Sequence, residues 1–167
     1  FNQARIRGGR MKHVKQNKNE CILAAISALT DTPYGEIRSR ANRIARRIGL
    51  DSYQALFDSG RTEADWHPVI ETLGKQCRFN YVPLLKLRAN KEWSLVHLTP
   101  TKLKRKGFIL LRFPNSRHIV AFENGLVYDG NADGPLTPKQ YKEFLRVRWN
   151  CSPNDVQACV RSRYQLT

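Results

Sequence analysis

The first half of the chain has the apolar spacing of helices. Residues 21 to 29 are apolar almost throughout, which is typical of a buried central helix. After the turn "TDTP", apolar residues recur every three or four positions up to about Ile48, which predicts a second helix. Its inner face is expected to carry Tyr34, Ile37, Ala41, Ile44 and Ile48.

Residue types at the expected helix ends support these boundaries. We expect Thr32 to be the N-cap of the second helix, Pro33 to take its first position and Gly49 to end it. A short third helix is expected from Trp66 to Leu73, closed by Gly74.

The second half of the chain has the pattern of strands. Residues 77 to 83 alternate between apolar and polar, and residues 107 to 113 form a continuous apolar run. Residues 118 to 130 predict two strands joined by an Asn124-Gly125 turn. A helical first half followed by a strand-rich second half indicates an α+β fold.

The predicted hairpin brings three polar side chains together. With a two-residue Asn124-Gly125 loop, His118 lies opposite Asn131, and Val120 lies opposite Asp129. Side chains on one face of a strand recur every second residue, so the histidine, the aspartate and the asparagine point the same way. Asp129 is then the diagonal neighbour of His118, within reach of a side-chain hydrogen bond.

Length and composition indicate one globular domain. The chain has 167 residues, of which 41% are hydrophobic, and it has no run of the ~20 apolar residues that span a bilayer. Residues 1 to 10 contain no apolar signal-peptide core, so we expect a cytoplasmic protein without membrane partners. Met11 is the only methionine, which suggests an upstream extension or vector remnant at 1–10, a domain at 11–150 and a C-terminal segment at 151–167.

The formal net charge of +15 bears on partners more than on the fold. A surface this basic either binds nucleic acid or another polyanion, or simply keeps the protein soluble. Candidate polyanion contacts are Arg38, Arg43, Arg46, Arg47, Lys102, Lys104, Arg105 and Lys106.

The four cysteines are expected to be thiols. They are too few and too scattered for a disulfide scaffold in a chain of this length. There is no C-x2-C pair, and the four histidines are far apart in sequence, so neither a metal site nor a cofactor is expected. The tryptophans are expected in the core or in the walls of a groove.

Cys21 stands where a polar loop meets the apolar helix. Such a cysteine can be a packing residue, or it can be a nucleophile, because a helix N-terminus stabilises a thiolate. Together with the hairpin, it supplies every part of a thiol acyl-transfer site. Cys21 would attack a carbonyl, His118 would hold the thiolate and protonate the leaving group, and Asp129 or Asn131 would orient His118. The Cys21 N–H and the Gln16 side chain would bind the oxyanion.

Two segments resemble papain-like cysteine peptidases of the C39-like branch. "KQNKNECILAAISALTDTPYGEI" is similar to the opening of that family, and "RHIVAFENGLVYDGN" is similar to its His strand, turn and Asp strand. The resemblance implies a papain-like fold in which the helix that carries Cys21 packs on an antiparallel sheet that carries His118 and Asp129. Gln16 is one residue closer to the cysteine than is usual, so Asn17 or Asn19 is an alternative oxyanion donor. Ile22 stands where many members have Gly.

The sequence therefore predicts a cysteine peptidase that cleaves a peptide or isopeptide bond in a peptide or protein substrate. The alternative is a basic nucleic-acid-binding protein, or a viral or mobile-element effector, on a papain-like scaffold with a vestigial site.

Overall fold

A computed structural model describes residues 11–57, 63–78 and 92–163 of the chain. Within them, one antiparallel sheet has the strand order β1-β5-β2-β3-β4. The strands are β1 (Trp93–Ser94), β2 (Lys106–Arg112), β3 (Arg117–Glu123), β4 (Leu126–Tyr128) and β5 (Gln157–Arg163). The α-helices are α2 (Cys21–Thr30), α3 (Tyr34–Arg47), α4 (Glu63–Cys77) and α5 (Pro138–Trp149). Short 3-10 helices are η1 (Tyr53–Phe57), η4 (Leu95–His97), η5 (Pro100–Leu103) and η6 (Pro153–Asp155). The predicted α+β class is confirmed.

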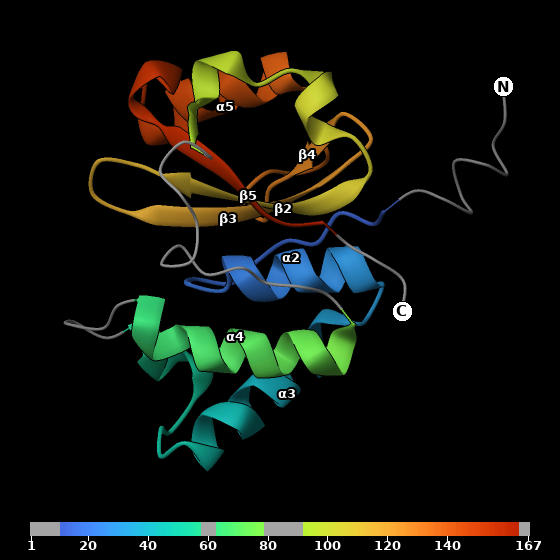
Figure 1. Ribbon diagram of the computed structural model, residues 1–167, viewed down its shortest axis with the longest axis vertical. Helices are drawn as coiled ribbons and strands as arrows, with labels where there is room; N and C mark the ends of the chain where they lie inside the picture. Colours follow the sequence, from blue (N-terminus) through green and yellow to red (C-terminus); the bar gives the residue numbers. More distant parts are fainter. Residues whose placement is uncertain (1–10, 58–62, 79–91, 164–167) are drawn as a thin grey trace, which may run out of the picture.

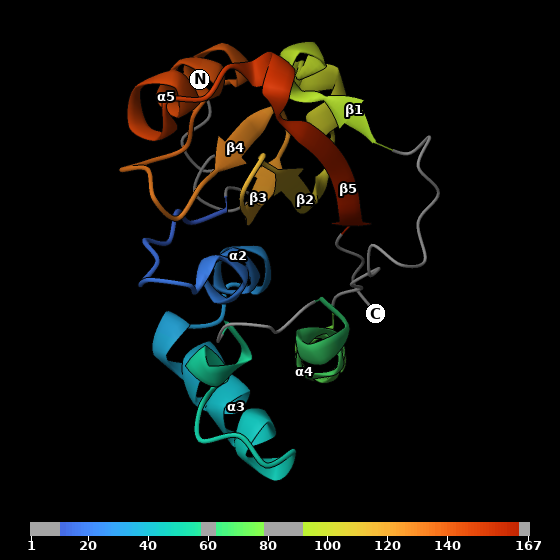
Figure 2. The ribbon, with the colours of Figure 1, turned by 90° about the vertical axis from the view of Figure 1, so that its left-hand side faces the viewer.

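Helices cover both faces of the sheet. α5 lies on one side, α2 lies on the other, and α3 and α4 lie beyond α2 (Figures 1 and 2). Along β2, Phe108 and Leu110 pack in the hydrophobic cluster that contains α2, whereas Ile109 and Leu111 pack in the cluster that contains α5. Burial on both faces explains why β2 is apolar at successive positions.

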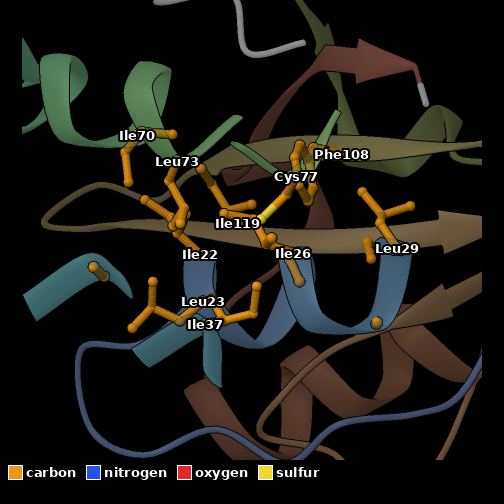
Figure 3. Packing of buried hydrophobic residues seen from close by; sticks show 14 of the residues in the cluster. Ile22, Leu23, Ile26, Leu29, Ile37, Ile70, Leu73, Cys77, Phe108 and Ile119 are labelled. Carbon is orange, nitrogen blue, oxygen red and sulfur yellow. The ribbon is translucent and has the colours of Figure 1, made fainter. Parts of the chain in front are cut away.

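α2 is the centre of the larger core cluster. Every residue from 22 to 29 is buried. Figure 3 shows Ile22 and Ile26 of α2 among side chains that include Leu73 of α4 and Ile119 of β3. A helix surrounded in this way needs no polar face, and the prediction of a buried helix over residues 21–29 is confirmed.

α3 matches the second predicted helix except at its ends. Its N-cap position is Pro33, and no side chain caps it, so the prediction for Thr32 is wrong. Ile48 is the C-cap and is 52% exposed rather than on the inner face, because the chain leaves the helix there. Ala45 is buried instead. Gly49 ends the helix with a φ of +94°, as predicted.

α4 is longer than the helix predicted over 66–73. It continues past Gly74 to Cys77, because Leu73 and Cys77 extend its buried stripe and packing outweighs the low helix propensity of glycine. Cys77 is therefore the last residue of a helix and not the first of a strand. Residues 79–83 of that predicted strand lie outside the described residues, as does the extension predicted over residues 1–10.

The hairpin forms in the predicted register, but its ladder is short. Asn124 and Gly125 have φ values of 46° and 93°, as a type I′ turn requires, and three residue pairs connect β3 to β4. Pairing stops at Tyr128, so the predicted Val120–Asp129 and His118–Asn131 pairs do not form.

Two hydrogen bonds from the N-terminal segment explain why the ladder ends. The Asp129 carbonyl accepts a hydrogen bond from His13 Nε2 (2.8 Å), and the Gly130 carbonyl accepts one from the Gln16 N–H (3.0 Å). The segment after β4 is thus paired with residues 13 to 16 and not with β3.

α5 and β5 were not predicted. α5 begins with a capping box in which Thr137 and Gln140 each bond to the backbone of the other, with Pro138 at the first position. β5 lies between β1 and β2, so residues 157–163 of the C-terminal segment are part of the same sheet.

Candidate active site

His118, near the start of β3, forms a buried ion pair with Asp129. Its Nε2 lies 3.0 Å from Asp129 Oδ1, and the two side chains are 4% and 0% exposed. Burial alone lowers the pKa of His118, but the Asp129 carboxylate and the Cys21 side chain raise it to about 10. Burial raises the pKa of Asp129, yet His118 and the other hydrogen-bond donors around the carboxylate lower it overall. Both shifts favour the charged forms of the pair, an imidazolium and a carboxylate.

Cys21 completes the site from the N-terminus of α2. Its side chain is half-buried and close enough to the His118 ring to contribute to the raised pKa of that ring. Because Asp129 occupies Nε2, Nδ1 is the ring atom left for the thiol. The structure therefore brings together the thiol, imidazole and carboxylate named from the sequence, in the order Cys21, His118, Asp129.

Two further groups fix the Asp129 carboxylate. The Asn131 N–H donates to Oδ1 (2.7 Å), and the Tyr141 hydroxyl donates to Oδ2 (2.7 Å). Burial raises the pKa of Tyr141, and the neighbouring carboxylate raises it further, so this hydroxyl stays protonated and remains a donor. Asn131 thus contacts the site through its backbone, on Asp129, and not as the side-chain partner opposite His118.

Tyr141 was missed because α5 was not predicted. The sequence "LTPKQ" contains the Thr-Pro-x-Gln pattern of a capped helix start, and this signal could have located α5. Nothing in the sequence pairs Tyr141 with Asp129, because the contact depends on how α5 packs on the sheet.

An aromatic wall shields the ion pair. The Trp149 ring, at the end of α5, lies 5.8 Å from the His118 ring between centroids, and it stacks on Phe113 at 5.3 Å. The predicted role of Trp149 as a core or groove residue agrees with this position.

The residue before the thiol is a buried carboxylate that does not cap the helix. Glu20 accepts hydrogen bonds from Tyr34, Arg38 and Gln54, and it makes no side-chain hydrogen bond to α2. Burial raises the pKa of Tyr34, and the Glu20 carboxylate adds to this effect. The first-turn amides of α2, including that of Cys21, are consequently not occupied by the Glu20 side chain.

Gln16 lies between the thiol loop and the aspartate loop. Its side chain packs on Gly130 so closely that a Cβ there would lie 2.7 Å from Gln16 Oε1. Its Nε2 donates to the Asn17 carbonyl (3.3 Å), and its Oε1 is buried with no partner among the described residues. Asn17 donates its N–H to the Tyr34 hydroxyl, and Asn19 has a φ of +60°.

The candidate polyanion contacts have different surroundings. Arg38 and Lys106 are ion-paired with buried carboxylates (3.3 and 3.6 Å), and Lys102 lies 4.7 Å over the Trp93 ring. Arg38 is nevertheless exposed, as are Arg43, Arg46, Arg47, Lys104 and Arg105. α3 lies at one end of the long axis, and residues 102–106, which lead into β2, lie beyond α2 from it, so the two basic stretches do not form one patch (Figures 1 and 2).

Three further features are absent from the part of the chain that the structure describes: disulfides, metal sites and membrane-spanning helices. None of the four cysteines, all of which lie in the described residues, forms a disulfide bond. No three His, Cys, Asp or Glu side chains of the described residues gather at metal-binding distances. Among the helices in the described ranges, none has the length and apolarity needed to span a membrane. Comparison with protein-family models and with curated proteins gives no match for this chain.

Proposed function

We propose that this protein is a papain-like cysteine peptidase that cleaves a peptide or isopeptide bond through Cys21, His118 and Asp129. The observation that carries the proposal is the connected series of thiol, imidazole and carboxylate groups, in which the ion pair is buried and the thiol is partly open to solvent. A structural histidine needs one such partner, whereas this ring has a carboxylate on Nε2 and a thiol close enough to raise its pKa, which leaves Nδ1 for the thiol.

The first half of the reaction forms a thioester. The reaction starts from a Cys21 thiolate beside the His118 imidazolium, and the thiolate attacks the substrate carbonyl carbon and forms a C–S bond. His118 Nδ1 then gives its proton to the leaving nitrogen as the C–N bond breaks. Asp129 keeps the ring oriented and stabilises its charge during this transfer.

The oxyanion forms beside the start of α2. The Cys21 N–H is a first-turn amide without an intrahelical acceptor, so it can donate to the substrate oxygen. The side-chain amide of Gln16 has a second N–H besides the one bonded to Asn17, and we assign it the second donor role; Asn17 and Asn19 are the alternatives.

Hydrolysis of the thioester restores the enzyme. His118, now neutral, takes a proton from water as the water oxygen attacks the acyl carbon. The C–S bond breaks, the carboxylic acid leaves, and the thiolate and imidazolium are regenerated.

A peptide-profiling experiment tests this proposal. The full chain is incubated with a proteome-derived mixture of peptides that includes isopeptide-linked peptides, and new termini are identified by mass spectrometry. We expect new termini with the wild type and none with Cys21→Ala or His118→Ala. Cys151→Ala is the matched control, because Cys151 is a similarly half-buried thiol that packs against the cluster on the α5 side of the sheet instead of standing at the start of α2, and it should retain cleavage.

Two results would overturn the proposal. One is cleavage that persists in Cys21→Ala. The other is the absence of new termini with the wild type, together with salt-dependent nucleic-acid binding that is lost when Arg43, Arg46 and Arg47 are changed to Glu. That second result supports the binding protein with a vestigial site.

A further inference from the structure

A pocket of about 690 Å³ lies beside the candidate active site. Its lining residues are Asn131, Phe144, Val147, Arg148 and Trp149. Four of the five belong to the C-terminal half of α5, and Asn131 belongs to the loop that follows Asp129.

The pocket shares two walls with the ion pair. Trp149 contributes one wall, and its ring also lies against His118 at 5.8 Å. Asn131 contributes a second wall, and its backbone N–H donates a hydrogen bond to Asp129 Oδ1 (2.7 Å). A group bound against Trp149 in the pocket would therefore contact a residue whose ring also lies against the imidazole.

The aromatic walls of the pocket are held in place before any ligand arrives. Phe144 stacks on Tyr141 with centroids 5.9 Å apart, and Trp149 stacks on Phe113. Val147 is 78% exposed in spite of its apolar side chain. An apolar group bound against Phe144, Val147 and Trp149 would remove the exposed Val147 side chain from water, which is favourable.

The pocket also carries a positive charge that forms no ion pair within the described residues, although it is near enough to Asp133 to help lower the pKa of that carboxyl. Arg148 is exposed, and no carboxylate of the described residues lies within 4.0 Å of its guanidinium. The nearby Asp133 is ion-paired with Lys15 at 2.9 Å. By contrast, Arg146 on the same helix is paired with Glu143. The guanidinium of Arg148 is thus available to a carboxylate from outside the chain.

We propose that this pocket recognises a peptide segment in which a large apolar side chain is next to an aspartate or glutamate. The apolar side chain lies between Phe144, Val147 and Trp149, and the carboxylate pairs with Arg148. The inference rests on the proposed function, since it names the class of peptide that the same site would cleave.

The test uses binding and cleavage as separate measurements. Fluorescent ten-residue peptides with a central Leu-Asp, Leu-Lys or Ser-Asp pair are titrated into the Cys21→Ala protein, which binds without turnover. We expect the Leu-Asp peptide to bind about tenfold more tightly than Ser-Asp, as for the loss of an apolar group from a pocket. It should bind about fivefold more tightly than Leu-Lys, as for an exposed charge pair.

A charge exchange identifies the residue responsible. Adding Arg148→Glu should reverse the order of the Leu-Asp and Leu-Lys peptides. Arg146→Glu, the matched control on the same helix but outside the pocket, should leave the order unchanged.

The outcomes separate this inference from the proposed function. Equal binding of the three peptides, or an order that Arg148→Glu does not reverse, would overturn the pocket assignment even if the wild type cleaves all three. The predicted order of binding, without cleavage of the Leu-Asp peptide by the wild type, would support the pocket assignment and count against peptidase activity.

Discussion

His118 Nε2 lies 3.0 Å from Asp129 Oδ1, and both side chains are almost completely shielded from solvent. The N–H of Asn131 and the hydroxyl of Tyr141 bind the same carboxylate, and the ring of Trp149 lies against the imidazole. The ion pair is thus held by β3, the loop after β4, and α5, three parts of the chain that only the folded structure brings together.

Replacing Asp129 should impair turnover less than replacing the groups that react. We expect Asp129→Asn to lower kcat/KM by up to about 10⁴-fold, and Cys21→Ala or His118→Ala to lower it by about 10⁶-fold. Asn131→Ala should have a smaller effect than Asp129→Asn, because it keeps the backbone N–H that contacts the carboxylate. Steady-state kinetics on one cleaved peptide checks the order; a larger loss in Asn131→Ala would show that its side chain is the orienting group.

The His118–Asp129 pair should stabilise the fold over a defined pH range. His118 binds its proton more tightly in the folded state, with a pKa of about 10 against 6.5, so its contribution is complete below pH 6.5 and is lost as the pH rises to about 10. The pKa of Asp129 is lowered from 3.8, so its contribution is present above pH 3.8 and is lost as the pH falls through the folded-state value.

The measurement is the difference in free energy of unfolding between the wild type and His118→Ala. We expect this difference to be smaller at about pH 9.5 than at about pH 5.5, because the stabilising protonation is being lost. The same difference at both pH values would mean that His118 is not a stabilised imidazolium in the folded protein.

Tyr141 should act on the site through Asp129. Tyr141→Phe removes the hydroxyl that donates to Oδ2, leaving a buried carboxylate oxygen without that partner, at a cost of about 1–3 kcal/mol in unfolding free energy. Tyr141→Phe keeps the charge of Asp129 and Asp129→Asn removes it, so the pKa of His118 should change less in Tyr141→Phe than in Asp129→Asn. NMR titration of the His118 ring checks this. Tyr34→Phe is the control, because it removes a hydroxyl from a different buried carboxylate, Glu20, and should leave the His118 titration unchanged.

A single methyl group at Gly130 should disturb the proposed oxyanion donor. A Cβ at this position would lie 2.7–2.9 Å from three atoms of the Gln16 side chain, so Gly130→Ala forces that side chain or the loop to move. We expect a loss of about 1–3 kcal/mol in unfolding free energy and a lower kcat. Gly134→Ala is the matched control, because a Cβ there meets nothing within 4 Å. Equal effects of the two substitutions would show that the contact with Gln16 is unimportant.

The sequence predicted the parts of this structure that local pattern determines. The apolar run after Cys21 specified a buried helix, and Asn124-Gly125 specified the turn and therefore the register of the first three pairs of the hairpin. The same register also brought Asp129 close to His118, and this contact is present although the ladder itself stops one residue earlier.

The parts that were missed depend on contacts between distant segments. The ladder ends at Tyr128 because His13 and Gln16 bond to residues 129 and 130, a competition that the hairpin sequence alone does not contain. Helix α5, with Tyr141, was not predicted in spite of its capping signal. The contacts of Tyr141 with Asp129 and of Trp149 with His118 arise from the packing of that helix on the sheet.

The most direct test of the central claim is the rate at which iodoacetamide alkylates each cysteine at neutral pH, measured by peptide mapping. If Cys21 is held beside the His118 imidazolium, it should react at least tenfold faster than Cys151, which is also half-buried, and this advantage should disappear in His118→Ala. Cys77 and Cys159 are buried and should react more slowly than either. Equal rates for Cys21 and Cys151, unaffected by His118→Ala, would contradict the assignment of Cys21 as the nucleophile.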